Sequence, residues 1–243
     1  MLNLPRSTPP ASDRTAPVPP SPRRGAATRV ARRLCPLSDR LIGGSSLVPN
    51  QPLLDMRGFP WTGALRHEWT AIRDEARAVV RDGSGAEAFC LHGCGYPVVD
   101  NLARCPRTAA ALAGVPGLKT AFFATLAPGA HVPPHRGVTK GLITCHLALV
   151  VPRDGDARMR VGDRIVRWAE GETLVFDDTY DHEAWNDAAD PGIILSIQFE
   201  RPLAQPGKWL ADLLMGLVRR SPRVRHARAE PRRWAAAIGR MHI

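Results

Sequence analysis

Two histidines stand at opposite ends of the stretch of this chain most suited to chemistry. His135 lies in HVPPHRG (131–137), and His182 lies in DDTYDHEAWND (177–187). The residues between them are typical of alternating β-strands, and a neutral imidazole on a strand is a good ligand for a divalent transition metal. A closed β-fold that brought both rings together would leave several metal positions open for substrates. We therefore take His135 and His182 as candidate metal ligands.

The local sequence around each histidine favours a fixed side chain. Two prolines precede His135 and Gly137 follows it, which indicates a stiff backbone that other groups approach closely. An acidic run precedes His182 and Glu183 follows it, and carboxylates there could orient or charge-balance a metal-bound ring. Spacing alone leaves open the alternative that each histidine is packed or on the surface.

A rival metal motif is Cys90-Leu-His-Gly-Cys94. Two thiols and an imidazole could begin a zinc site, but a C-x3-C with no second matching pair is a weak signal. Cys145 stands between Thr144 and His146, so on a strand its side chain points to the opposite face from theirs. We expect Cys145 to be a small core residue.

The hydrophobic pattern predicts helices that flank a β-domain. One helix covers 62–81, with its apolar face at steps of three and four: Leu65, Trp69, Ile72, Ala76 and Val79. A short helix covers 105–114, and a third, 208–219, is expected to pack on the barrel or in a homodimer interface. A membrane-surface role is the alternative for this third helix.

Short strand-like runs fill the region between these helices. They cover 119–126, 143–151, 157–161, 164–168, 173–177, 181–186 and 192–199, and Asp154-Gly155 and Gly162-Asp163 mark turns between some of them. Several short strands at close spacing predict a barrel or a double-sheet jelly roll.

Charge and composition divide the chain into three parts. The net charge is +10, with eight Arg and two Asp in 1–50 and ten Lys or Arg and two acids in 201–243, so the middle is mildly acidic. Basic ends could meet nucleic acid or anionic lipid, but the arginine excess over lysine does not by itself indicate a specific nucleic-acid partner. Residues 49–203 are expected to form the functional domain and 204–243 a basic helical extension.

Residues 1–48 are rich in Pro, Arg, Ser and Ala and lack a periodic apolar face. They predict a disordered tail, and deleting 1–45 should then leave stability nearly unchanged. No run approaches the roughly 20 apolar residues that span a bilayer. The five cysteines fit no secreted disulfide framework, which favours a reducing cytoplasm.

Several motifs together resemble the aspartyl/asparaginyl β-hydroxylase family over roughly residues 50 to 202. They occur in one order: NQPLLDMRGFPW, EWTAIRDEA, CPRTAAALAGVPG, LAPGAHVPPHRG, HLALVVP, WAEGETLVFDDTYDHEAWND and a closing RP. The resemblance implies a mainly β fold, a cupin-type double-stranded β-helix with flanking α-helices. It also implies a dioxygenase that uses Fe(II), 2-oxoglutarate and O2 to hydroxylate an unactivated C–H bond, such as the β-carbon of an Asp or Asn residue.

The resemblance assigns roles to individual residues. His135 and His182 would hold the iron, with Gly137 where related oxygenases have a third, carboxylate ligand. His146 matches the position that contacts the 2-oxoglutarate carboxylate. Family substrates include peptide side chains, amino acids and, in bacterial relatives, lipid acyl chains, and the sequence does not choose among them.

This chain departs from the family pattern in the half that binds the cosubstrate. Thr144 and Gly192 stand where two arginines are usual, and Ala124 replaces a common serine. Neither threonine nor glycine can imitate the bidentate fork of a guanidinium. Lys140, then Arg160, and also Arg136 are the candidate replacement cations, with Thr144 beside them in the site.

Two further interpretations follow from the missing arginines. One is a non-catalytic cupin that binds a metal or a small acid. The other is a metal-dependent enzyme of different chemistry. If 2-oxoglutarate is the cosubstrate, we expect it to bind more weakly than is typical of the family.

Overall fold

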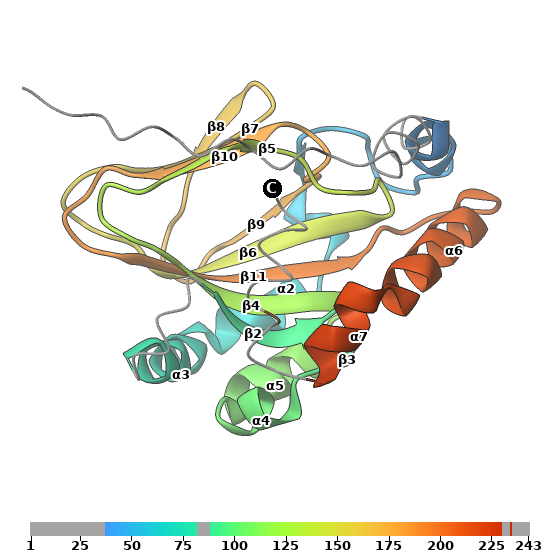
Figure 1. The fold of residues 1–243 in the computed structure, drawn as a ribbon. Helices are drawn as coiled ribbons and strands as arrows, with labels where there is room; N and C mark the ends of the chain where they lie inside the picture. The colour runs from blue at the N-terminus through green and yellow to red at the C-terminus, as the bar shows by residue number, and fades with distance from the viewer. Residues whose placement is uncertain (1–36, 82–87, 230–233, 235–243) are drawn as a thin grey trace, which may run out of the picture.

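The computed structural model describes residues 37–81, 88–229 and 234. Two sheets face each other (Figure 1). In the large sheet the strands run in the order β1-β9-β6-β11-β4-β2-β3, and in the small sheet in the order β5-β10-β7-β8. Every pairing is antiparallel. The architecture is the double-stranded β-helix that the resemblance predicts.

The strand bounds agree closely with those predicted. The large sheet holds β1 (Leu53–Leu54), β2 (Ala88–Gly93), β3 (Tyr96–Pro97), β4 (Leu118–Leu126), β6 (Leu142–Val150), β9 (Thr173–Phe176) and β11 (Gly192–Glu200). The small sheet holds β5 (His131–His135), β7 (Ala157–Val161), β8 (Arg164–Arg167) and β10 (His182–Asn186). Strands β1, β2, β3 and β5 were not predicted from the sequence.

Strand β6 shows why both faces of the large sheet are apolar. Eight of its nine residues are buried, because one face meets helices and the other faces the small sheet. Thr144 and His146 line the space between the sheets, whereas Cys145 belongs to the helix-covered core and is fully buried. The prediction that Cys145 is a core residue on the opposite face is confirmed.

Helices cover the outer face of the large sheet (Figure 1). The predicted helix 62–81 is two helices, α2 (Thr62–His67) and α3 (Trp69–Arg81), separated at Glu68. The predicted apolar face is correct, since Leu65, Ile72, Ala76 and Val79 are buried. The second predicted helix is α5 (Pro106–Ala113), and η1 (Met56–Gly58) and α4 (Val99–Ala103) complete this layer. Together they bury the main hydrophobic core.

The C-terminal extension forms α6 (Gly207–Arg220) and α7 (Pro222–Ala229). Helix α6 packs through Ala211 against Gly141, where a Cβ on the glycine would lie 3.0 Å from the Ala211 Cβ. Val224, Ala227 and Trp234 are buried in a second cluster beside Cys90, Cys94 and Val98. The extension is therefore part of the folded body.

The predicted boundary of the N-terminal tail at residue 48 is wrong. Residues 37–44 form a helix in which Ile42 is fully buried. Lys140 donates its backbone N–H to Asp39 Oδ1 at 2.9 Å, and Ser46 forms a β-bridge with Leu203. These contacts join the segment to the domain, so the prediction that removing 1–45 is harmless loses its basis. Residues 1–36 lie outside the described residues.

Within the described parts of the chain, none of the helices has the length and apolar character needed to cross a membrane.

Candidate functional site

His135 and His182 are cross-strand partners. Strand β10 pairs with β5 in a register that sets His182 opposite His135, and the two ring centroids lie 4.1 Å apart. Both side chains line a cavity between the sheets. The structure thus brings together the two histidines that lie 47 positions apart in the sequence.

Backbone carbonyls fix the tautomer of both rings. His135 Nδ1 bonds to Pro133 O at 2.8 Å, and His182 Nδ1 bonds to Tyr180 O at 2.9 Å. A carbonyl oxygen only accepts, so each Nδ1 carries the proton and each neutral ring keeps its lone pair on Nε2. Metal-binding histidines in proteins are oriented by the same kind of hydrogen bond.

A buried carboxylate, that of Asp178, lies beside the histidine pair. Thr144 Oγ1 and Gln198 Nε2 donate to its Oδ2 at 2.9 and 2.8 Å. Its Oδ1 is buried and has no hydrogen-bond partner among the residues that the structure describes. Burial raises the pKa of Asp178 above its ordinary value, although both hydrogen bonds and the nearby His182 act in the opposite direction.

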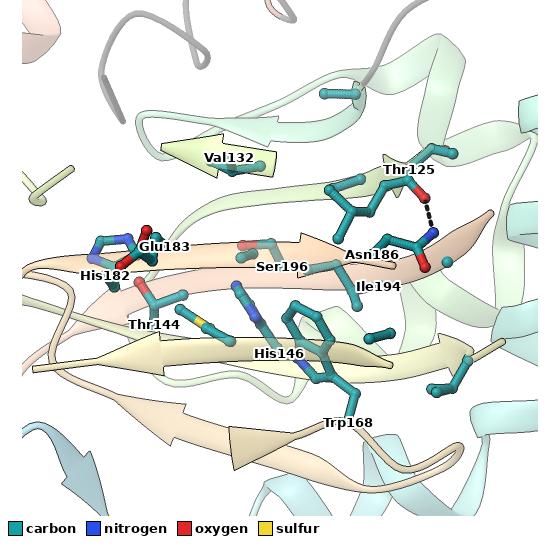
Figure 2. Close-up of a pocket in the computed structure, with 18 of the residues that line it drawn as sticks. Thr125, Val132, Thr144, His146, Trp168, His182, Glu183, Asn186, Ile194 and Ser196 are labelled. Atoms are coloured by element: carbon teal, nitrogen blue, oxygen red, sulfur yellow. Dashed lines mark hydrogen bonds between the residues drawn. The ribbon is translucent and has the colours of Figure 1, made fainter. Parts of the chain in front are cut away.

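The cavity extends from the histidines along the strands (Figure 2). His182 and Thr144 lie at one end, His146 and Ser196 in the middle, and Thr125 and Asn186 at the other end. Its volume is about 270 Å³, and most of its wall is apolar. The apolar wall includes Phe122, Ala124, Leu126, Val150, Val151, Pro152, Met159, Phe176, Gly192 and Ile194.

His146 lies in the middle of this cavity. Its ring meets Phe176 edge-on with centroids 4.8 Å apart, and Trp168 is 6.2 Å away. The indole Nε1 of Trp168 is buried and finds no hydrogen-bond acceptor within the described part of the chain. A carboxylate bound in the cavity could contact the His146 ring and the indole N–H of Trp168.

The candidate replacement cations do not line the cavity. Lys140 Nζ binds Asp177 Oδ2 at 2.8 Å and Thr179 Oγ1 at 3.2 Å. Arg160 pairs with the Glu183 carboxylate. Arg136 pairs in the same way, with Asp181. All 24 residues of the described cavity wall are neutral, acidic or histidine.

The Cys90–Cys94 motif has a packing role in this structure. Cys90 lies on β2, and its Sγ donates to His92 O at 3.3 Å. Cys94 takes a left-handed backbone conformation, with φ 51°, and belongs to the same hydrophobic cluster as Trp234. No group of three or more His, Cys, Asp or Glu suited to a metal occurs among the described residues. The cysteine motif gains no support as a zinc site.

Comparison with known proteins agrees with this geometry. A family model described as "Aspartyl/Asparaginyl beta-hydroxylase" matches residues 66–202, more than half of the chain. The chain belongs to the aspartyl/asparaginyl β-hydroxylase family.

Two relatives indicate the range of this hydroxylase family. The chain is 31% identical to the ornithine lipid ester-linked acyl 2-hydroxylase of Rhizobium tropici, over 90% of this chain and 85% of that one. It is 29% identical to the human aspartyl/asparaginyl β-hydroxylase, over 59% of this chain and 21% of the human protein. The chain therefore spans about a fifth of the human relative and most of the bacterial one.

Solved structures give more distant likenesses. A cupin domain from Schizosaccharomyces pombe matches 33% of this chain and 55% of its own, with 14% identity and a TM-score of 0.28. A cupin barrel protein from Salinispora arenicola matches 41% of this chain and 71% of its own, with 11% identity and the same TM-score.

Sequence reasoning missed three residues of this hydroxylase-family site. Asp178 was part of an acidic run whose members could not be told apart. Trp168 begins one of the family motifs but had no assigned role, and Gln198 carried no motif. The signal that could have singled out Asp178 is its position four residues before His182, together with Gly137 two residues after His135.

Proposed function

We propose that this protein is an iron(II)-dependent hydroxylase that inserts one oxygen atom of O2 into an unactivated C–H bond of a lipid acyl chain. The observation that carries the proposal is the cross-strand pair of His135 and His182, each held by a backbone carbonyl with Nε2 as the remaining ligand atom.

The residues present fit a divalent metal. Imidazole nitrogen is a donor that suits iron(II), and the two histidines supply two such donors. Asp178 Oδ1 is a buried acceptor beside them that lacks a described donor. His135 and His182 would hold the metal, which would supply the redox chemistry that activates O2.

The protein's own contribution is placement and exclusion of water. The cavity wall is largely apolar from Phe176 to Val150, so it keeps bulk water away from the reacting groups. His146 and Trp168 would orient a carboxylate of the cosubstrate. Thr144 and Gln198 hold Asp178 in place beside the histidines.

The residues do not fit the whole of 2-oxoglutarate, the expected cosubstrate. Its 2-oxo acid end would bind the metal held by His135 and His182 and would contact His146 and Trp168, which line the cavity. Its second carboxylate requires a cation, and the described cavity wall supplies no lysine or arginine. We therefore propose that a 2-oxo acid donates the electrons, and the proposal assigns no role to a second carboxylate.

A lipid substrate is favoured over a peptide by the extent of similarity. The relative that aligns over 90% of this chain acts, by its name, on an ester-linked acyl chain. An Asp or Asn residue in a peptide is the alternative substrate, supported by the human relative. We place the reaction in the cytoplasm, since no disulfide joins the cysteines of the described residues, as is usual in a reducing compartment.

The first test measures Fe(II) binding and product together. The purified protein receives Fe(II), a 2-oxo acid, O2 and an ornithine lipid, and mass spectrometry follows the gain of one oxygen atom on the acyl chain. His135→Ala and His182→Ala should each lose Fe(II) binding and product. His131→Ala is the matched control, because His131 lies on the same strand but bonds to Glu183 and is absent from the cavity wall.

A non-catalytic cupin is the second candidate, because the usual cations are missing. It predicts Fe(II) binding that depends on His135 and His182 but no oxygenated product with lipid or with Asp- and Asn-containing peptides. Absence of Fe(II) binding to the wild-type protein would contradict both candidates.

A further inference from the structure

The cavity has one polar end and one apolar end. The histidines, Thr144 and Asp178 form the polar end. The opposite end holds Thr125 and Asn186, and the rest of its wall is apolar: Leu126, Val150, Val151, Pro152, Gly192 and Ile194. A ligand held at the histidines by one end would direct its other end toward Gly192. The chemistry of that far end therefore decides which ligand fits.

Asn186, a polar residue at the far end, is already committed to the backbone. Its Nδ2 donates to Leu126 O at 3.0 Å and Asp190 O at 2.9 Å, and its Oδ1 accepts from Ala188 N at 3.2 Å. Among the residues that the structure describes at this end, a carboxylate would meet no lysine or arginine and none of this amide's protons. A hydrocarbon group would instead meet apolar walls on several sides.

We infer that the cosubstrate of this protein is a 2-oxo acid with a single carboxylate and an apolar side chain. The inference rests on the proposed function, and it specifies the cosubstrate of the same site. The carboxylate and 2-oxo group would lie at the histidine end near His146 and Trp168, and the side chain would point toward Gly192 and Ile194.

The reaction balances with this cosubstrate. The bond between C1 and C2 of the 2-oxo acid breaks, C1 leaves as CO2, and C2 becomes the carboxylate of an acid one carbon shorter. One atom of O2 enters that carboxylate, and the other enters the substrate C–H bond to give an alcohol. The 2-oxo acid supplies the two electrons that O2 needs beyond those of the C–H bond.

The test is a binding titration that does not depend on turnover. Protein loaded with Fe(II) without O2 is titrated with 4-methyl-2-oxopentanoate and, separately, with 2-oxoglutarate, and the visible absorption of the chelate is followed. We expect the apolar acid to bind about tenfold more tightly or better. Trp168→Phe, which removes the indole N–H, should weaken binding of the apolar acid.

A substitution at Gly192 should reverse this preference. A Cβ there meets only Val150 O at 3.5 Å and Pro152 Cδ at 3.7 Å, so a side chain has room to start. Gly192→Arg should tighten 2-oxoglutarate about tenfold and weaken the apolar acid. Gly192→Leu is the control for bulk, and it should weaken the apolar acid without tightening 2-oxoglutarate.

The outcomes separate this inference from the proposed function. Equal or tighter binding of 2-oxoglutarate by the wild-type protein would overturn the inference and leave the hydroxylase proposal standing. Failure of 4-methyl-2-oxopentanoate to give a chelate on iron-loaded protein would have the same consequence. Failure of Fe(II) itself to bind would overturn the proposed function.

A second, independent feature is an exposed apolar stripe on α6. Trp209, Leu213 and Leu217 are spaced four residues apart and are 67%, 58% and 57% exposed. Helix α6 lies at the edge of the molecule (Figure 1). Isolated apolar side chains on a surface are ordinary, but three in a row on one helix face form a continuous strip.

Basic residues accompany this stripe. Arg220 at the end of α6 and Arg225 on α7 are exposed, and residues 201–243 hold ten Lys or Arg against two acids. An apolar stripe with Trp and Leu, next to a basic segment, is the pattern of a helix that lies in a membrane interface. We propose that the α6 stripe docks on an anionic lipid bilayer, the place where a lipid substrate would be met.

Sedimentation with lipid vesicles tests this surface. The full-length protein is mixed with phosphatidylcholine vesicles with and without phosphatidylglycerol, and we expect it to sediment with the anionic vesicles. The double variant Leu213→Asn/Leu217→Asn should lose about tenfold in affinity. Ile165→Asn is the matched control, because Ile165 on β8 is 60% exposed, and it should bind as the wild type does.

Three outcomes would contradict bilayer docking. In the first, the wild-type protein stays in the supernatant. In the second, the double variant binds vesicles as well as the wild type does. In the third, sedimentation equilibrium shows that the wild type is a dimer and the double variant a monomer. The last result would assign the stripe to a second copy of the chain.

Discussion

The carboxylate of Asp178 fills the space in which a side chain at position 137 would begin. A Cβ built on Gly137 would overlap Asp178 Oδ1 and Cγ and stand 2.8 Å from Oδ2. The Gly137 N–H also donates to the Asp178 carbonyl at 2.7 Å, which fixes the two backbones together. The buried position of the Asp178 carboxylate thus requires a glycine at position 137.

Replacing Gly137 by Ala should therefore disturb the site. The carboxylate is buried and held by Thr144 and Gln198, so it cannot move without breaking those hydrogen bonds. We expect a loss of about 1–3 kcal/mol in the free energy of unfolding, measured by urea denaturation, and weaker Fe(II) binding. Gly63→Ala is the control, since a Cβ on this helical glycine meets nothing within 4 Å, and it should be neutral or stabilising. Equal effects of the two substitutions would contradict the crowding at Gly137.

Arg201 should be essential for stability although it lies outside the cavity wall. Its guanidinium and the carboxylate of Asp177 are completely buried against each other. Arg201→Met removes the charge and leaves Asp177 with Lys140, so we expect a loss of about 3–5 kcal/mol by urea denaturation. Arg57→Met removes a solvent-exposed pair with Asp55 and should have little effect. A small effect of Arg201→Met would show that Lys140 alone satisfies Asp177.

The buried cysteines should resist alkylation in the native protein. Burial raises the pKa of Cys105 to about 12 and also raises the pKa values of Cys90, Cys94 and Cys145. The thiolate is the reactive form, so iodoacetamide at about pH 8 should modify none of the four, while Cys35 lies outside the described residues. Mass spectrometry after the same treatment in urea should show them modified. Native labelling of any of the four would contradict the burial.

The same buried thiols should make the protein less stable at alkaline pH. Their pKa values are higher in the folded than in the unfolded chain, so the folded state keeps protons that the unfolded state releases. This contribution is fully present below the unfolded thiol pKa of about 8.5 and is lost as pH rises above it. The urea midpoint should fall between about pH 8 and pH 10. Cys145→Ala should reduce that fall, and an unchanged slope would contradict the assignment.

Truncations should locate the start of the folded domain. Deleting residues 1–45 removes Ile42 and the Asp39 contact, so we expect a loss of about 2 kcal/mol or more in the free energy of unfolding. Deleting 1–36 should leave the melting temperature unchanged, and a lower value would show that this segment contributes to the fold. Deleting 208–243 should also destabilise, through Val224, Ala227 and Trp234 rather than the exposed Trp209.

Local sequence signals predicted most of the fold. Alternating strands and helix periodicity identified seven strands and three helical regions, because burial of one face leaves a period that can be read from residue types. Strand β5 was not predicted because prolines interrupt it. Strand β2 was not predicted because Cys90 and Gly93, with Cys94 and Gly95 just after the strand, are typical of a connection. Residues 37–44 escaped because a proline-rich segment precedes them and they bury few apolar residues, Ile42 among them.

The two candidate metal ligands could be predicted from the sequence, but the positions of the cationic side chains could not. The histidine pair follows from strand pattern and family resemblance, and the structure sets the two residues opposite each other. The position of Lys140 could not be predicted, because its binding to Asp177 depends on how three distant segments pack. Whether another cation replaces the two usual arginines could be judged only from the residues that line the cavity.

Strand β5 is the edge of the small sheet, with β10 as its neighbour. Two of its five residues, Pro133 and Pro134, have no N–H to donate, so its attachment to the barrel is weak for its length. A metal bound by both His135 and His182 would link β5 to β10. Local opening of β5 would then require release of the metal ion. Metal binding should therefore slow amide hydrogen exchange in β10 more than in the rest of the barrel.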